Sequence, residues 1–191
     1  MTKIKFIEQG ASADIFDIGE NKILKAYYRR SHTDDMVTNW HDHDALSEAY
    51  FRVEAKVYEL LQTISKIEKY IPRFYGLTDP VKLLNNVTNN NHKYLKGCGI
   101  LLEYIPGQAE KVSRLPIDIK EKAEVILEEI SASINGLHVW DASFFTPGTR
   151  SLFTLIDFGT WEGFAEYQIA LNEEGTLSEE LRTSLSNEWA T

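Results

Sequence analysis

Residues 155–159 read Leu155-Ile156-Asp157-Phe158-Gly159, and they carry the strongest chemical signal in the chain. The apolar run at 152–156 predicts a buried strand, which delivers Asp157 onto a turn that Gly159 allows the backbone to make. A carboxylate at the end of a strand is suited to holding a hard divalent cation through its oxygens. We therefore take Asp157 as the candidate metal ligand.

A glycine-containing turn near the start of the chain is the second feature. Gly10, Ala11 and Ser12 separate two stretches, 3–8 and 13–18, whose apolar residues predict short strands. Small residues in such a turn let backbone N–H groups approach phosphate oxygens. The same residues also suit a plain β-hairpin, so this turn is compatible with both interpretations.

Two charged residues lie in otherwise apolar surroundings. Lys25 ends a predicted strand at 21–26, which follows a predicted turn at Gly19-Glu20-Asn21, and Glu54 lies in a predicted helix at 44–62. A lysine that points inward needs an anionic partner, and Glu54 is a candidate for that partner. The alternative interpretations are a solvated strand end for Lys25 and an exposed helical position for Glu54.

Hydrophobic periodicity gives the order of the remaining elements. Apolar residues recur every three or four positions through 44–62 and again through 120–137, which predicts two long helices. Further short strands are predicted at 72–76 and 99–104. The sequence therefore predicts an α+β protein with a small antiparallel sheet in its first half and a helical second half, which divide near Pro106 and Gly107.

The order of these parts resembles that of the protein-kinase-like superfamily. The shared parts are a glycine turn, a strand lysine, a helix glutamate, an apolar strand, a long helix and Asp157-Phe158-Gly159. The resemblance covers residues 6–160. It favours the compact aminoglycoside and choline phosphotransferase type, or the smallest atypical protein kinases, over large eukaryotic protein kinases. It implies one kinase-like domain over 1–191, with a small antiparallel-sheet N-lobe at 1–105 and a reduced helical C-lobe at 106–191.

Residue by residue, the resemblance implies a site for ATP and magnesium. Lys25 would pair with the α- and β-phosphates, and Glu54 would orient Lys25. Asp157 would carry the magnesium ion. The residues that would cover the phosphates are Gly10, Ala11 and Ser12. The hinge residues whose backbone would bond adenine are Glu103, Tyr104 and Ile105.

The segment before Asp157 departs from the family's catalytic loop, which reads His-x-Asp, then four residues, then Asn. Here Asp141 follows His138 by three positions, and Thr146 stands five positions after Asp141. On one alignment Asp141 is the base that accepts the substrate hydroxyl proton, with Ser143 or Thr146 in place of the asparagine. On the other, His138 closes the long helix, the catalytic loop is deleted and Asp141 is an ordinary loop residue.

Two functions follow from these alignments. The first is an ATP- and magnesium-dependent phosphotransferase that acts on a hydroxyl of a small molecule or a protein, with Asp141, Lys25 and Glu54 as its catalytic residues. The second is a pseudokinase, a regulatory module that binds a nucleotide or a protein partner. The sequence names neither the acceptor substrate nor the partner.

Length, charge and cysteine content restrict the remaining classes. The chain has 191 residues and a formal net charge of −9, which opposes binding to nucleic acid or to an anionic membrane. Its single cysteine, Cys98, excludes an internal disulfide, and we expect it to pack within a buried strand. The sequence starts without a secretory leader and has no apolar run of membrane-spanning length, so we expect a cytoplasmic protein.

The segment Trp40-His41-Asp42-His43-Asp44, just before the first predicted helix, leaves two alternatives open. Its imidazoles and carboxylates would suit a transition metal. Asp44 alone would suit the N-cap of that helix, because a carboxylate accepts hydrogen bonds from the first free N–H groups.

Overall fold

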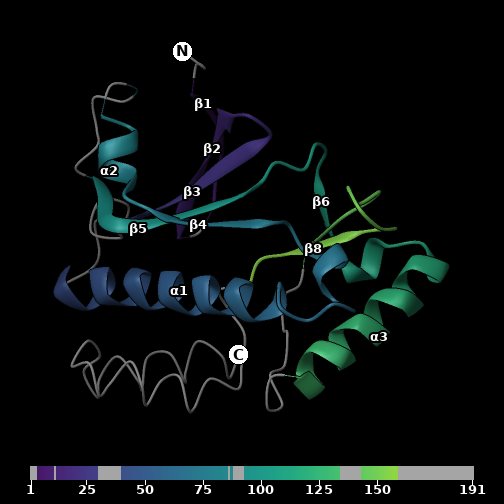
Figure 1. The fold of residues 1–191 in the computed structure, drawn as a ribbon. Helices are drawn as coiled ribbons and strands as arrows, with labels where there is room; N and C mark the ends of the chain where they lie inside the picture. Colours follow the sequence, from purple (N-terminus) through teal and green to yellow (C-terminus); the bar gives the residue numbers. More distant parts are fainter. Residues whose placement is uncertain are drawn as a thin grey trace. The chain divides into compact units, whose positions relative to one another are not determined.

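The computed structural model describes residues 4–10, 12–29, 40–85, 87, 93–133 and 143–158 (Figure 1). Over these residues the protein is α+β, as the sequence predicts. The described residues fall into two compact units. The first comprises those up to Arg52 and Gly76–Leu101, and the second comprises Val53–Tyr75 and those from Leu102 to Phe158.

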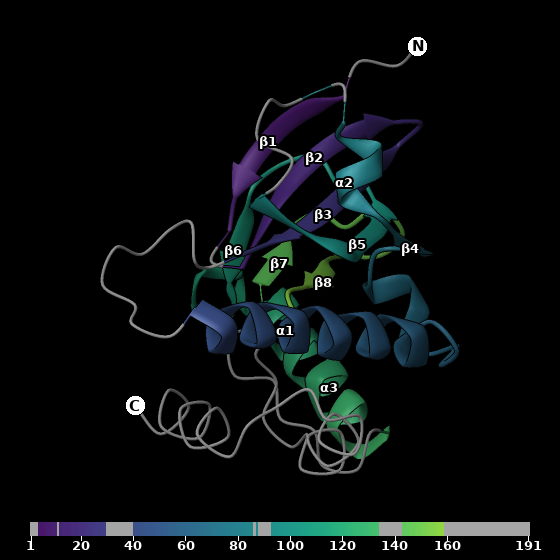
Figure 2. The same ribbon diagram turned by 90° about the vertical axis from the view of Figure 1, so that its left-hand side faces the viewer.

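Five strands form the first sheet, in the order β1-β2-β3-β5-β4. They are β1 (Lys5–Gln9), β2 (Ala13–Gly19), β3 (Lys22–Tyr28), β4 (Phe74–Thr78) and β5 (Tyr94–Glu103). The β1–β2 and β2–β3 pairs are antiparallel, and Figure 2 shows these three strands side by side. The strands predicted in this part of the chain are confirmed with shifted bounds. β3 continues to Tyr28, β4 spans Phe74–Thr78 rather than 72–76, and β5 begins at Tyr94 rather than at Gly99.

β1 differs from its neighbours in being exposed along its whole length. It is a terminal strand in the sheet order, and its register against β2 shifts between Phe6 and Glu8. Phe6 and Ile7 are 51% and 42% exposed. The first strand is therefore a bulged edge strand that contributes little to the core.

The β2–β3 hairpin turns at Glu20 and Asn21. Both residues have a left-handed backbone, with φ of 54° and 58°, as the central pair of a type I′ turn requires. The turn predicted from Gly19, Glu20 and Asn21 is therefore confirmed. It fixes the register of the hairpin, which places Lys25 opposite Ile15.

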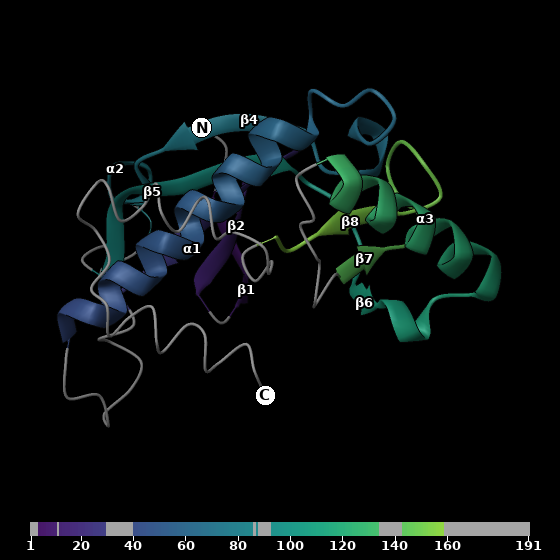
Figure 3. The ribbon, with the colours of Figure 1, turned by 90° about the horizontal axis from the view of Figure 1, so that it is seen from below.

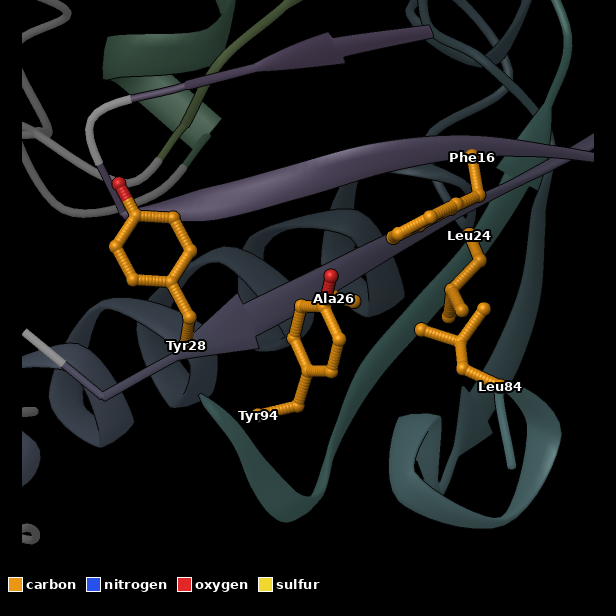
Figure 4. Close-up of a cluster of buried hydrophobic side chains, with 6 residues drawn as sticks. All are labelled: Phe16, Leu24, Ala26, Tyr28, Leu84 and Tyr94. Atoms are coloured by element: carbon orange, nitrogen blue, oxygen red, sulfur yellow. The ribbon is translucent and has the colours of Figure 1, made fainter. Parts of the chain in front are cut away.

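The two faces of β3 pack against different groups of side chains. On one face lies a buried cluster, drawn in Figure 4, made up of Phe16, Leu24, Ala26, Tyr28, Leu84 and Tyr94. On the other face Tyr27 packs edge-on against Phe51 of α1 (Trp40–Leu61), with ring centroids 5.5 Å apart. Because alternate residues of a strand point to opposite faces, Lys25 lies on the Tyr27 face.

A single-turn helix, α2 (Pro80–Leu83), brings Leu84 to the cluster. The carboxylate of Asp79 caps this helix by accepting the Val81 N–H at 3.1 Å. Figure 2 shows α2 beside the strands of the first unit. This short helix was not expected from the sequence, because four residues are too few to display a helical period.

The long helix α1 begins at Trp40, four residues before the predicted start at Asp44. Asp44 therefore lies inside the helix and is not its N-cap. Its carboxylate instead pairs with the Arg29 guanidinium at 2.6 Å. The metal alternative for 40–44 rests on side chains outside those that the structure describes.

A second, three-stranded sheet belongs to the second unit (Figure 3). Its strands are β6 (Ala109–Lys111), β7 (Ser143–Phe145) and β8 (Thr154–Ile156), paired antiparallel in that order. The unit also holds α3 (Ile117–Ser133) and two 3-10 turns, Glu68–Tyr70 and Val112–Arg114. The helix predicted at 120–137 is confirmed as far as Ser133, and residues 134–137 lie outside the described ones. The half predicted to be helical thus also contains a small sheet.

Aromatic side chains form the core of the second unit. Phe153 is fully buried between Tyr70, at a centroid distance of 5.0 Å, and Phe144, at 5.6 Å. Phe144 lies in β7 and Phe153 directly precedes β8, so this packing holds the β7–β8 pair against the Glu68–Tyr70 turn. Among the helices that the structure describes, none combines the length and apolar character needed to cross a bilayer.

Cys98 is buried in β5, as expected from its position between two glycines. Burial raises the pKa of its thiol to about 12, and the nearby carboxylate of Glu48 contributes in the same direction. The folded protein therefore favours the protonated thiol, and the thiolate that would react with electrophiles is scarce near neutral pH.

We expect iodoacetamide to label Cys98 at pH 8 about a thousandfold more slowly in the folded chain than in urea, where the pKa returns to about 8.5. Because the pKa of Cys98 is higher in the folded chain than in the unfolded chain, folding also becomes less favourable in alkali. The unfolded chain loses this proton first, so the contribution of Cys98 to stability is complete below pH 8.5 and is lost as the pH rises toward 12. Equal labelling rates in folded and unfolded protein would contradict the burial of this thiol.

Candidate functional site

The residues singled out in the sequence belong to both units. Gly10, Ser12 and Lys25 lie in the first unit, whereas Glu54, the hinge at 103–105 and Asp157 lie in the second. The structure describes each unit by itself. Ala11, His138 and Asp141 lie outside the described residues, so the predicted catalytic base and part of the glycine turn have no structural account.

The glycine turn is closed by hydrogen bonds on both sides of Gly10. Its N–H donates to the Ala13 carbonyl at 2.8 Å, and its carbonyl accepts from the Tyr28 hydroxyl at 2.7 Å. A Cβ at this position would lie 3.1 Å from the Ala13 carbonyl oxygen, which is a tight contact. Because the Gly10 N–H is already bonded, the predicted role of covering phosphates falls to the other N–H groups of the turn.

Lys25 lies in the middle of β3 rather than at its end. Its side chain is half-buried on the face that β3 turns toward Phe51, and its Nζ lies 5.7 Å from the centroid of the Tyr27 ring. An ammonium over an aromatic face gains an electrostatic attraction to the ring. The solvated strand end considered from the sequence is therefore replaced by a lysine inside the sheet.

Glu54 is 1% exposed, so the interpretation as a solvated helical glutamate is wrong. Tyr58, one helical turn later, is also 1% exposed and lies on the same side of α1. Burial raises the pKa of Tyr58, and the nearby carboxylates of Glu54 and Asp157 raise it further, whereas a hydrogen bond from the Asp157 backbone opposes them. The structure therefore brings Glu54, Tyr58 and Asp157 together.

Asp157 directly follows β8 and has a left-handed backbone, with φ of 73°. A non-glycine residue adopts this conformation at a cost, although aspartate tolerates it better than most. The next residue, Phe158, is fully buried and packs edge-on against Tyr58 with ring centroids 4.8 Å apart. This packing holds the backbone in place and leaves the Asp157 side chain half-buried at the end of the strand. The strand predicted at 152–156 is confirmed at Thr154–Ile156, whereas Leu152 is 58% exposed and lies before the strand. Gly159 lies outside the described residues.

Glu103 ends β5 and is fixed by its neighbours in the second unit. Its N–H donates to the Arg73 carbonyl at 2.9 Å, and its carboxylate accepts the Arg73 N–H at 3.2 Å. The guanidinium of Arg150 lies 3.7 Å from the same carboxylate and donates to the Ile71 carbonyl at 2.5 Å. The Glu103 N–H is therefore not available to an adenine ring. The predicted hinge role is left to the Glu103 carbonyl and to the backbone of Tyr104 and Ile105.

Ser143, one of the two residues considered in place of the missing asparagine, does not suit a metal. Its Oγ accepts a hydrogen bond from Lys111 Nζ at 3.1 Å. An ammonium at this distance repels a divalent cation and occupies one of the two lone pairs of the hydroxyl oxygen. Within the described residues no group of three or more histidine, cysteine, aspartate or glutamate side chains forms a ready-made metal site. Magnesium beside a nucleotide needs only one or two carboxylates in addition to the phosphates, and Asp157 is the described carboxylate that the sequence predicts for that position.

Three residues that shape this site were missed in the sequence. Tyr58 carried a weak signal, since it stands four positions after Glu54 on a predicted helix. The sequence gives no signal for Arg150 and Lys111, because their partners Glu103 and Ser143 are distant in the sequence.

A scan against protein-family models finds no family that matches this chain, and searches of curated proteins and of solved structures find no match either.

Proposed function

We propose that the chain is an ATP- and magnesium-dependent phosphotransferase with a kinase-like arrangement of its elements, which transfers the γ-phosphoryl group to a hydroxyl of a small molecule or a protein. The observation that carries the proposal is the placement of Asp157. It is a half-buried carboxylate at the end of a buried strand, held in a left-handed conformation and grouped with the buried Glu54. The order of the parts in the sequence supports the same function.

In this proposal each residue has one electrostatic task. Lys25 binds the α- and β-phosphates, Glu54 orients Lys25, and Asp157 binds magnesium, which when present neutralises charge on the phosphates. The turn of Gly10, Ala11 and Ser12 covers the phosphates, through the N–H groups of Ala11 and Ser12, because the Gly10 N–H bonds the Ala13 carbonyl. The residues that meet the base through their backbone are Glu103, Tyr104 and Ile105.

Transfer also needs a group that accepts the proton of the attacking hydroxyl, and we assign this role to Asp141. The acceptor oxygen forms a bond to the γ-phosphorus, the bond from that phosphorus to the bridging oxygen breaks, and ADP leaves with the electron pair. The hydroxyl proton passes to the Asp141 carboxylate.

A pseudokinase is the second candidate, and the Lys111–Ser143 contact favours it. Ser143 and Thr146 were the two candidates to replace the metal-binding asparagine of the family. Because Ser143 is bonded to the Lys111 ammonium, it is no longer a suitable candidate. Such a module would bind a nucleotide or a protein partner without transfer. Consumption of ATP that Asp141→Asn abolishes would favour the phosphotransferase, and nucleotide binding without consumption would favour the pseudokinase. Exclusion of nucleic acids and membranes as partners, and a cytoplasmic location, remain predictions.

Thermal unfolding with a non-hydrolysable ATP analogue and magnesium tests the nucleotide site. At a ligand concentration a hundred times Kd, the free energy of unfolding of the wild type should rise by about 2.7 kcal/mol. Lys25→Met should remove most of this rise, because it removes the cation that pairs with the phosphates. Lys22→Met is the matched control, since Lys22 lies on the same strand and pairs with the exposed Glu20. No stabilisation of the wild type at millimolar nucleotide would contradict the proposal.

A further inference from the structure

Tyr28 is bonded to both sides of the glycine turn. It is the last residue of β3 and only 5% exposed, and Figure 4 shows its ring at one end of the buried cluster. Its hydroxyl donates to the Gly10 carbonyl at 2.7 Å, and its backbone N–H donates to the Ser12 carbonyl at 3.3 Å. One residue of the neighbouring hairpin therefore holds the turn before and after Ala11.

The ring of Tyr28 is itself fixed by a polar network. Lys93 Nζ lies 5.8 Å from the centroid of this ring and 2.5 Å from Asp14 Oδ2. Asp14 is 1% exposed, and its Oδ2 also accepts the Tyr94 hydroxyl at 2.8 Å. The Lys93 carbonyl accepts the N–H of Arg29, the residue after Tyr28, at 2.7 Å. A mutually bonded network of this kind, built around the buried Asp14 carboxylate, restricts the positions that its members can take.

The two hydroxyl groups in this network have different partners. The Tyr28 hydroxyl bonds to the backbone of the glycine turn, whereas the Tyr94 hydroxyl bonds to a buried carboxylate on β2. Both rings belong to the same buried cluster (Figure 4). Removing either hydroxyl therefore costs one hydrogen bond, but of the two only the Tyr28 hydroxyl bonds the glycine turn.

From these contacts we infer that Tyr28 is a positioning residue for the phosphate end of the nucleotide site, and that its hydroxyl keeps the glycine turn in its binding conformation before ligand arrives. This inference rests on the proposed function. A turn that is already ordered loses less conformational freedom when it binds phosphates. The ordering therefore raises the affinity for the triphosphate, and it leaves the affinity for the nucleoside, which has no phosphates, unchanged.

The experiment compares Tyr28→Phe with Tyr94→Phe in the full chain. Isothermal titration measures the affinity for Mg-ATP and for adenosine, and amide hydrogen exchange follows the Gly10 N–H without ligand. Tyr28→Phe should weaken Mg-ATP binding about fivefold, the equivalent of about 1 kcal/mol for one hydrogen bond, with adenosine binding unchanged. The same variant should exchange the Gly10 N–H faster. Tyr94→Phe should lower the melting temperature at least as much, yet leave both affinities and the Gly10 exchange at wild-type values.

Other outcomes would overturn either the positioning role of Tyr28 or the proposed nucleotide binding. If the wild type binds Mg-ATP but the two variants weaken it equally, Tyr28 acts only through stability and the positioning role is wrong. An unchanged Gly10 exchange rate in Tyr28→Phe would also overturn it, because the turn would then be ordered without the hydroxyl. If the wild type binds neither ligand, the proposed function fails and the assignment of Tyr28 to nucleotide binding fails with it.

Discussion

Asp157→Asn should abolish the magnesium-dependent stabilisation by nucleotide while leaving the unliganded fold intact. The left-handed backbone at Asp157, with φ of 73°, makes asparagine the informative substitution, because asparagine tolerates this conformation as aspartate does. An alanine there would add backbone strain to the loss of charge and confuse the two effects. Asparagine removes only the negative charge that binds the metal.

The measured quantity is the rise in melting temperature caused by ATP analogue and magnesium. At a hundred times Kd this rise is about 5 to 10 °C for a chain of this size, and Asp157→Asn should reduce it to about zero. Asp118→Asn is the matched control, since Asp118 is an exposed acid in the first turn of α3 and carries the same charge change within the second unit. A full nucleotide response in Asp157→Asn would show that Asp157 is not the metal ligand.

The largest loss of stability is expected from Gly148→Ala. Gly148 lies between β7 and β8, and a Cβ there would stand 2.5 Å from the Phe153 carbonyl oxygen and 2.7 Å from Thr154 Oγ1. The first of these is a backbone atom next to the buried Phe153 ring, so the clash is relieved only by moving the β7–β8 connection. We expect a loss of about 3 kcal/mol or more, which lowers the melting temperature by about 6 to 12 °C.

Gly97→Ala is the control that separates the cost of a steric clash from the cost of a left-handed backbone. Gly97 has φ of 77°, yet a Cβ there would meet no atom within 4 Å. Its replacement should cost only the left-handed penalty of about 1 to 2 kcal/mol. Urea unfolding followed by circular dichroism measures both variants, and a Gly148→Ala loss no larger than that of Gly97→Ala would disprove the close approach at Phe153.

The parts of the fold that the sequence predicted are those set by local signals. Gly19, Glu20 and Asn21 mark a turn between two apolar stretches, and the structure has a two-residue hairpin there. Regular apolar spacing identified α1 and α3, because each presents one buried face over several turns. An aspartate before a periodic stretch is typical of an N-cap, so the sequence predicts that α1 starts at Asp44. In the structure this carboxylate instead forms an ion pair with Arg29, inside the helix.

What the sequence did not predict depends on contacts between distant residues. β6 is three exposed residues, Ala109–Lys111, which show no alternation and become a strand only by pairing with β7. Asp157 and Glu54 could be proposed as site residues because their types and spacing carry chemistry. Tyr58 and Arg150 were recognised only when the structure placed them beside Asp157 and Glu103, since each acts by holding another residue.

The exposed first strand has a consequence for the behaviour of the chain at high concentration. A strand at the end of a sheet order offers unpaired backbone groups to other molecules, and Phe6 and Ile7 add apolar surface to it. The irregular register at Phe6 and Glu8 interrupts the regular ladder that a second molecule would need to extend. The flanking charges of Lys5 and Glu8 act in the same direction. Straightening or neutralising this strand would therefore favour self-association through edge-to-edge pairing, which the bulge opposes.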